Sequence, residues 1–209
     1  MAKRMSKNCH MCDTDVWVKL SCVDKVNLLF MDCDEILITE VVKIEVNHLA
    51  KNYPEYKCSL DKLVQHLRSD TEKVSVIYPN KVFDSTINAS IRAAAASFGY
   101  TLGSKSIHKD FGEISTAIIA DHMGINIIKS DDKKFADTIV PKNFLGINVI
   151  NLSNIFEISK TKGYLTDKER IALQTRIEEI SRHVDDIKST VGFIDYMINP
   201  VEVFLNSLK

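Results

Sequence analysis

Short runs of aliphatic residues alternate with helical segments of about ten residues through the first 150 positions, and this alternation constrains the fold more than any other feature. It is typical of βαβ units, in which helices cover both faces of a mainly parallel sheet. We therefore expect an α/β fold with three layers. The expected strands lie at 8–12, 36–39, 73–78, 125–129 and 147–152, and the expected helices at 15–29, 40–50, 60–67, 85–98 and 112–123.

The pattern changes after about residue 153 and becomes entirely helical. Thr166 and Glu169 have the spacing of a capping box, which predicts a helix from there to about residue 187. A further helix is expected from Pro200 to the C-terminus. We therefore divide the chain into an α/β domain at 8–153 and a helical extension at 154–209. The apolar stripe of the extension either packs on the core or mediates contacts with a partner.

The balance of charge excludes several classes of protein. The chain has 27 Lys and Arg against 28 Asp and Glu, a formal net charge of −1, and therefore neither a basic arm nor an acidic tail. A local phosphate site is still compatible with this balance. No run of 18 apolar residues is present, and the basic N-terminus lacks the apolar segment of a signal peptide. We expect a cytoplasmic protein without a membrane partner.

All five cysteines lie in the first 58 residues, and we expect them to be reduced thiols. Cys9 and Cys12 are three positions apart in an expected strand, so their side chains should point to opposite faces. Two thiolates would also leave a tetrahedral zinc site half empty. We therefore expect neither zinc nor a disulfide at this pair, and we expect Cys22, Cys33 and Cys58 to be core residues on separate elements.

Acidic residues follow expected strands or lie on the helices that come next. Because the carboxyl ends of parallel strands meet at one edge of a sheet, these acids should converge there. Neighbouring carboxylates cannot all ionise cheaply, and Mg²⁺ or Mn²⁺ relieves their repulsion. The acids concerned are Asp13, Glu45, Glu113, Asp131 and Asp132.

Each of these acids also has a structural interpretation. Asp13 suits an N-cap, and Glu113 suits the first turn of a helix. Glu45 lies in an apolar stripe but would face solvent if the helix were rotated. One of Asp131 and Asp132 is expected to be functional and the other to be a solvated turn residue.

Four segments in this order resemble the motifs of PIN-domain nucleases. Asp-Thr-Asp-Val-Trp-Val from Asp13 resembles the opening motif, and Ile-Thr-Glu-Val-Val-Lys-Ile-Glu-Val places Glu45 at the family's glutamate. Gly112-Glu113, followed by a glycine and a strand ending in Ser-Asp-Asp, resembles the third and fourth acids in the Gly-Glu variant of a toxin-like subgroup. The Ser130 to Phe135 spacing favours Asp132 as the last acid, whereas the subgroup also permits Asp131. The resemblance covers residues 8–170.

This resemblance implies a PIN-like fold and a metal-dependent endoribonuclease, either a toxin of a toxin–antitoxin pair or a nuclease of host defence or RNA processing. The implied cofactor is Mg²⁺ or Mn²⁺, and the implied partners are RNA and an inhibitor protein. The apolar stripe of the helical extension leaves a homodimer open as well. A DNA nuclease and a non-catalytic PIN-like interaction module are the alternatives. Supporting roles are expected at Asp15 and Ser130 beside the ligands, and at Lys129, Lys133 and Lys134 on substrate phosphates, although a solvated loop explains these lysines equally well.

Overall fold

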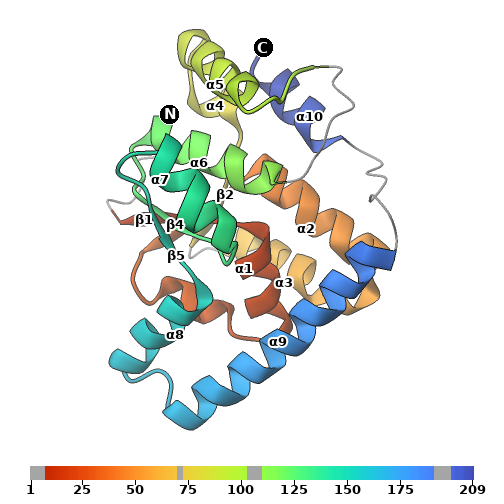
Figure 1. The fold of residues 1–209 in the computed structure, drawn as a ribbon, viewed down its shortest axis with the longest axis vertical. Helices are drawn as coiled ribbons and strands as arrows, with labels where there is room; N and C mark the ends of the chain where they lie inside the picture. The colour runs from red at the N-terminus through yellow and green to blue at the C-terminus, as the bar shows by residue number, and fades with distance from the viewer. Residues whose placement is uncertain (1–7, 70–72, 103–109, 191–198) are drawn as a thin grey trace.

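The computed structural model describes residues 8–69, 73–102, 110–190 and 199–209, and within them five strands form one parallel sheet (Figure 1). The strand order is β3-β2-β1-β4-β5, and all four neighbouring pairs are parallel. The three-layer α/β/α architecture expected from the sequence is therefore confirmed. The strands are β1 (Cys9–Cys12), β2 (Glu35–Thr39), β3 (Val74–Ile77), β4 (Ile127–Lys129) and β5 (Asn148–Ile150).

Helices cover both faces of the sheet and bury two apolar clusters against it (Figure 1). The first face carries α5 (Ser85–Ser97), α6 (Phe111–Met123), α7 (Val140–Asn143) and α10 (Pro200–Ser207). The second face carries α1 (Thr14–Cys22), α3 (Lys57–Arg68), α8 (Leu152–Thr161) and α9 (Asp167–Thr190). The helix α2 (Glu40–Asn52) contributes side chains to both clusters, and the short elements η1 (Val26–Phe30), η2 (Pro54–Tyr56), α4 (Pro79–Val82) and η3 (Phe135–Ile139) connect the rest.

The first strand is poor in aliphatic residues but lies at the centre of the sheet, between β2 and β4. Its side chains alternate between the two clusters: Cys9 and Met11 pack in the first, and Cys12 packs in the second. A strand covered on both faces needs small or apolar side chains on each side, and cysteine satisfies that requirement. The opposite orientation of Cys9 and Cys12 expected from the sequence is thereby confirmed.

Three expected boundaries are wrong for local reasons. The helix expected at 15–29 ends at Cys22, because Asp24 adopts a left-handed conformation with φ of 56° and the chain continues as the 3₁₀ helix η1. Ser59 does not cap α3, which begins at Lys57; its hydroxyl instead donates to the Tyr56 carbonyl at 2.6 Å. The strand expected at 125–129 begins at Ile127, because the Ile125 amide closes the preceding helix by donating to Ala120.

The described part of the helical extension packs on the α/β core. Thr166 and Glu169 form the expected capping box, with the Glu169 carboxylate accepting from the Thr166 amide at 2.8 Å. Leu173 and Ile177 of α9 are buried in the second cluster, and Phe204 of α10 is fully buried in the first. No helix in the described ranges is both long enough and apolar enough to cross a membrane.

Candidate active site

Asp13 lies between the end of β1 and the start of α1, at the carboxyl edge of the sheet. Its side chain is 1% exposed and accepts hydrogen bonds from the Thr14 amide at 2.7 Å and the Ser130 hydroxyl at 3.2 Å. Burial raises the pKa of Asp13 well above its usual value, and the charges of Glu113, Glu45 and Asp15 raise it further. The expected N-cap is present, but capping alone does not explain a buried carboxylate surrounded by other acids.

Glu45 lies on α2, and its carboxylate is close to Asp13. Its Oε2 accepts a hydrogen bond from the Thr14 hydroxyl, so the residue after Asp13 orients the second acid. The backbone of Gly112 lies directly against this carboxylate: a Cβ atom added there would be 2.7 Å from Oε2 and 2.8 Å from Oε1. The glycine of the Gly-Glu pair therefore makes room for Glu45.

Glu113 is in the first turn of α6, immediately after that glycine. Burial raises the pKa of Glu113 to about 8, and the charges of Glu45, Asp132 and Asp110 contribute to the shift. A carboxyl group with this pKa holds a proton for much of the neutral range. Asp13, Glu45, Glu113 and Asp132 therefore form one electrostatically coupled group, which we call the acid group.

The structure distinguishes between the two consecutive aspartates. The Asp132 carboxylate accepts from the Phe135 amide at 2.6 Å, and its charge acts on Glu113. Asp131 instead accepts from the Lys19 ammonium at 2.8 Å and the Leu152 amide at 3.3 Å. The geometry therefore favours Asp132 as the member of the acid group. Ser130 is fully buried and links Asp13 to Asp132. Its hydroxyl donates to the Asp13 carboxylate and accepts from the Asp132 amide.

Lys19 is a site residue that the sequence analysis missed. Its ammonium forms ion pairs with Asp15 at 2.7 Å and Asp131 at 2.8 Å, and only 8% of the residue is exposed. Burial lowers the pKa of Lys19, but the charges of Asp15 and Asp131 outweigh burial and leave the pKa raised. The i,i+4 spacing of Asp15 and Lys19 on one helix was the available signal. Asp15 and Asp131 are thus held by a lysine beside the acid group.

The expected role of Lys129 is wrong. Its side chain is fully buried, and its ammonium donates to the Leu29 carbonyl at 2.9 Å and pairs with Asp32. It therefore cannot reach a phosphate outside the fold. Lys133 and Lys134 are exposed, as a substrate contact requires, and Lys134 pairs with Asp110 at 2.7 Å.

The chemistry of the acid group suits a divalent cation. The distances between its carboxylates limit how many of them can bind one ion directly. Carboxylate oxygens suit Mg²⁺ or Mn²⁺, and a cation would relieve the repulsion that raises the pKa of Asp13 and Glu113. No three of these acids bring ligand atoms within 4.8 Å of one another in the described structure. Ligands of one Mg²⁺ lie at most about 4.2 Å apart, but Mg²⁺ commonly keeps several waters and uses only one or two carboxylates.

A different trio is the one group in the described ranges that meets that distance limit: His10, Asp32 and Cys33. The ammonium of Lys129 already pairs with Asp32, and the Cys33 thiol donates to the Leu29 carbonyl at 3.2 Å. Burial raises the pKa of the Cys33 thiol to about 12. A protonated thiol beside a buried ammonium is a poor setting for a second cation.

We expect reduced protein to contain five free thiols and no stoichiometric zinc. Cys12 is fully buried and Cys9 faces the opposite side of the sheet, so this pair can neither share a metal nor form a disulfide. Elemental analysis of protein purified without chelator, together with a thiol count after anaerobic denaturation, measures both quantities. One zinc per chain would contradict this expectation.

Comparisons with known proteins give little beyond this geometry. No family model and no curated protein matches the sequence. A solved structure, described as VapBC2 from Rickettsia felis bound to a DNA fragment from their promoter, contains a chain that is 15% identical with a TM-score of 0.41. The match covers 68% of this chain and 98% of that chain. A likeness of this size assigns neither a family nor an activity.

Proposed function

We propose that the chain is a metal-dependent endoribonuclease of the PIN-like type. The observation that carries the proposal is the acid group itself: carboxylates from four separate segments of the chain meet around the buried Asp13 at the carboxyl edge of a parallel sheet. Buried like charges are expensive, and a fold retains them where they serve binding or catalysis. The resemblance of the surrounding segments to PIN-domain motifs supports the same function.

In this proposal Asp13, Glu45, Glu113 and Asp132 hold one or two Mg²⁺ or Mn²⁺ ions. When bound, such ions activate water and stabilise the leaving oxygen of a phosphodiester. The chain's own residues fix the ligands: Ser130 holds Asp13, and Thr14 holds Glu45. Glu113, with its pKa of about 8, releases a proton when its carboxylate becomes a ligand.

The choice of RNA rests on the family resemblance, since the acid group alone suits any phosphodiester. Exposed Lys133 and Lys134 lie directly after Asp132 and could hold the substrate backbone. A DNA nuclease with the same acids is the nearest alternative. A non-catalytic interaction module is the other, in which the acids would bind no metal.

Cleavage of matched RNA and DNA oligonucleotides with Mn²⁺, Mg²⁺ or chelator tests the proposal. We expect RNA cleavage that requires the metal, and its loss in a Glu45→Gln/Glu113→Gln double variant. Cleavage confined to DNA would favour the first alternative. Absence of cleavage, together with no Mn²⁺ binding by calorimetry, would favour the second.

We expect Gly112→Ala to reduce cleavage about 10-fold while changing thermal stability little. The added methyl group would displace the Glu45 carboxylate, a disturbance comparable to loss of a contact that orients a metal ligand. Alanine also favours the helix by roughly 1 kcal/mol, which offsets strain in the fold. Single-turnover cleavage and thermal melts measure the two effects. Ala117→Gly, on a buried position of the same helix, is the control for altered helix stability.

The protein partners and the location of the chain are also proposals. An inhibitor protein of the antitoxin type follows from the resemblance to a toxin-like subgroup, and a homodimer follows from the apolar stripe of the helical extension. The cytoplasmic location is an expectation from the sequence alone. Light scattering of the purified chain tests the dimer. Co-expression with the product of an adjacent small gene tests the inhibitor, which should both copurify with the chain and abolish its metal-dependent cleavage.

A further inference from the structure

Two cysteines that are far apart in the sequence meet where α1 and α3 pack together. Cys22 is the last residue of α1, and Cys58 is the second residue of α3. Their sulfur atoms are 3.2 Å apart, and both side chains are partly exposed. From the sequence, both are expected to be core residues on separate elements, because nothing in their spacing of 36 positions indicates contact.

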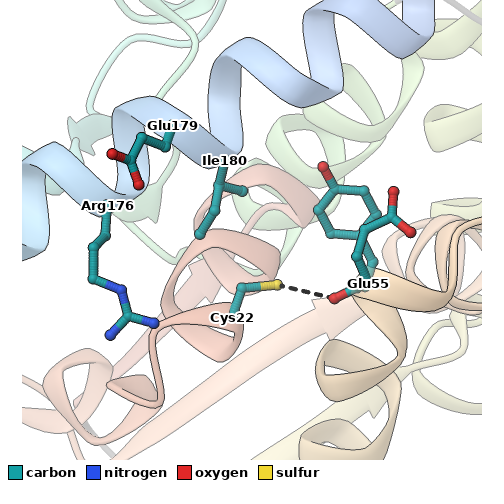
Figure 2. A pocket seen from close by; sticks show the side chains of 6 residues that line it. Cys22, Glu55, Arg176, Glu179 and Ile180 are labelled. Carbon is teal, nitrogen blue, oxygen red and sulfur yellow. Dashed lines mark hydrogen bonds between the residues drawn. The ribbon is translucent and has the colours of Figure 1, made fainter.

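A surface pocket gives reagents access to Cys22 of this pair (Figure 2). The pocket lies between the end of α1, the η2 segment and α9, and Cys22 forms part of its wall beside Glu55 and Arg176. Figure 2 shows the Cys22 sulfur directed toward the Glu55 backbone carbonyl, 4.0 Å away, and the Arg176 guanidinium on the other side of Cys22. A small solute can therefore reach Cys22 without unfolding of the core, and the Cys58 sulfur lies 3.2 Å from the Cys22 sulfur.

We propose that Cys22 and Cys58 form an oxidisable dithiol site, which a peroxide converts into an intramolecular disulfide that joins α1 to α3. One thiolate attacks a peroxide oxygen, becomes a sulfenic acid and releases water or hydroxide. The second thiol then attacks the sulfenic sulfur, forms the S–S bond and releases water. Overall, two thiols lose two electrons and two protons, and one hydrogen peroxide becomes two waters.

The geometry needs only a small adjustment for this reaction. A disulfide bond is about 2.05 Å long, so the two sulfurs must approach by roughly 1.2 Å, which rotation of the side chains can supply. Cys58 also contacts the Glu55 carbonyl, at 3.7 Å, so both thiols share one local environment. Burial and the Cys58 thiol raise the pKa of Cys22, which keeps Cys22 protonated at neutral pH and slows its own attack on an oxidant.

The other three cysteines serve as internal controls. Cys12 is fully buried and Cys33 is 7% exposed, while Cys9 faces the opposite side of the sheet from Cys12. No other contact between two thiol sulfurs is found in the described ranges, which include all five cysteines. Oxidation should therefore join one particular pair.

The test treats the reduced full-length chain with a few equivalents of hydrogen peroxide at pH 8, followed by denaturation, thiol counting and peptide mapping. We expect the count to fall from five thiols to three, with a Cys22–Cys58 linked peptide and a mass loss of two hydrogens. The melting temperature should rise by roughly 5–10 °C, because the bond closes a long loop, and dithiothreitol should reverse both changes.

Matched variants assign the site. Cys22→Ser and Cys58→Ser should each keep all four remaining thiols under the same treatment, whereas Cys33→Ser should fall from four thiols to two. A disulfide mapped to another pair, a disulfide between two chains, or oxidation of single cysteines to sulfinic acid would overturn the proposal. The mapping of the unaltered chain decides the question even if a variant fails to fold.

Discussion

Asp13→Asn is expected to lower metal-dependent RNA cleavage by at least roughly 100-fold while leaving the fold intact. Asp13 is the most deeply buried member of the acid group and is central to it, since the charges of both Glu45 and Glu113 act on it. Asparagine keeps the size of the side chain but removes the charge that a Mg²⁺ ion with few protein ligands needs. Single-turnover cleavage at saturating metal measures the effect.

The same variant should be at least as stable as the unaltered chain when metal is absent. Asparagine is as good an N-cap as aspartate, so the hydrogen bond from the Thr14 amide can be kept. It also removes a buried charge from the neighbourhood of Glu45 and Glu113, whose repulsion raises the pKa of Asp13. Thermal melts in chelator measure this stability. A large loss of stability would mean that the activity loss reports on folding and not on the site.

Asp15→Asn, two positions further along the chain, is the matched control. The Asp15 carboxylate is held by the Lys19 ammonium at 2.7 Å, and Asp15 is not a member of the acid group. We expect activity within a few-fold of the unaltered chain. If Asp15→Asn abolished cleavage and Asp13→Asn did not, the assignment of the first motif would be wrong.

Stability of the metal-free chain is expected to fall as the pH rises from about 4.5 to 8. The pKa of Glu113 is about 8 in the folded chain, against an unperturbed value of 4.5, so the folded state binds more protons than the unfolded state in this window. Stability therefore decreases with pH, by up to ~1.4 kcal/mol per pH unit for one group. Asp13, whose pKa is also raised, acts in the same direction. Urea unfolding in chelator at several pH values measures the slope.

Two further measurements tie this slope to the acid group. Glu113→Gln should flatten it, because the titrating group is gone. Added Mn²⁺ should restore stability most strongly near pH 8, and its binding should release protons, which calorimetry in buffers of different ionisation enthalpy detects. An unchanged slope in Glu113→Gln would show that other groups cause the pH dependence.

Local pattern was sufficient to predict most of the fold. The α/β alternation predicted the parallel sheet, and α6 ends at Met123, as its expected bounds of 112–123 require, with Gly124 at φ of 67° after it. The errors arose where one residue changes the backbone locally, such as the turn at Asp24. The capping box at Thr166 was predictable because both of its partners lie within four residues.

The sequence predicted those site residues that follow strands or lie on the next helix, because the order of the elements places them at the carboxyl edge of the sheet. That order brought forward Asp13, Glu45 and Glu113, and the local Ser130 to Phe135 spacing favoured Asp132. Neither indicated that Lys19, 112 residues away, holds Asp131. The order of the elements also failed for Lys129, whose partner Asp32 is 97 residues away. The contact between Cys22 and Cys58 was missed for the same reason: side-chain pairing across elements leaves no local pattern.

The position of α10 has a consequence for the order in which the chain folds. Phe204 of α10 lies in the first cluster and packs edge-on against Phe111, with ring centroids 5.5 Å apart. The two residues are 93 positions apart in the sequence, so this contact forms only after a long loop has closed. The second cluster contains no residue of α10 and can assemble without that step. Glu113 follows Phe111 by two positions, so the side of the acid group that carries it would become rigid later than the side that carries Asp13.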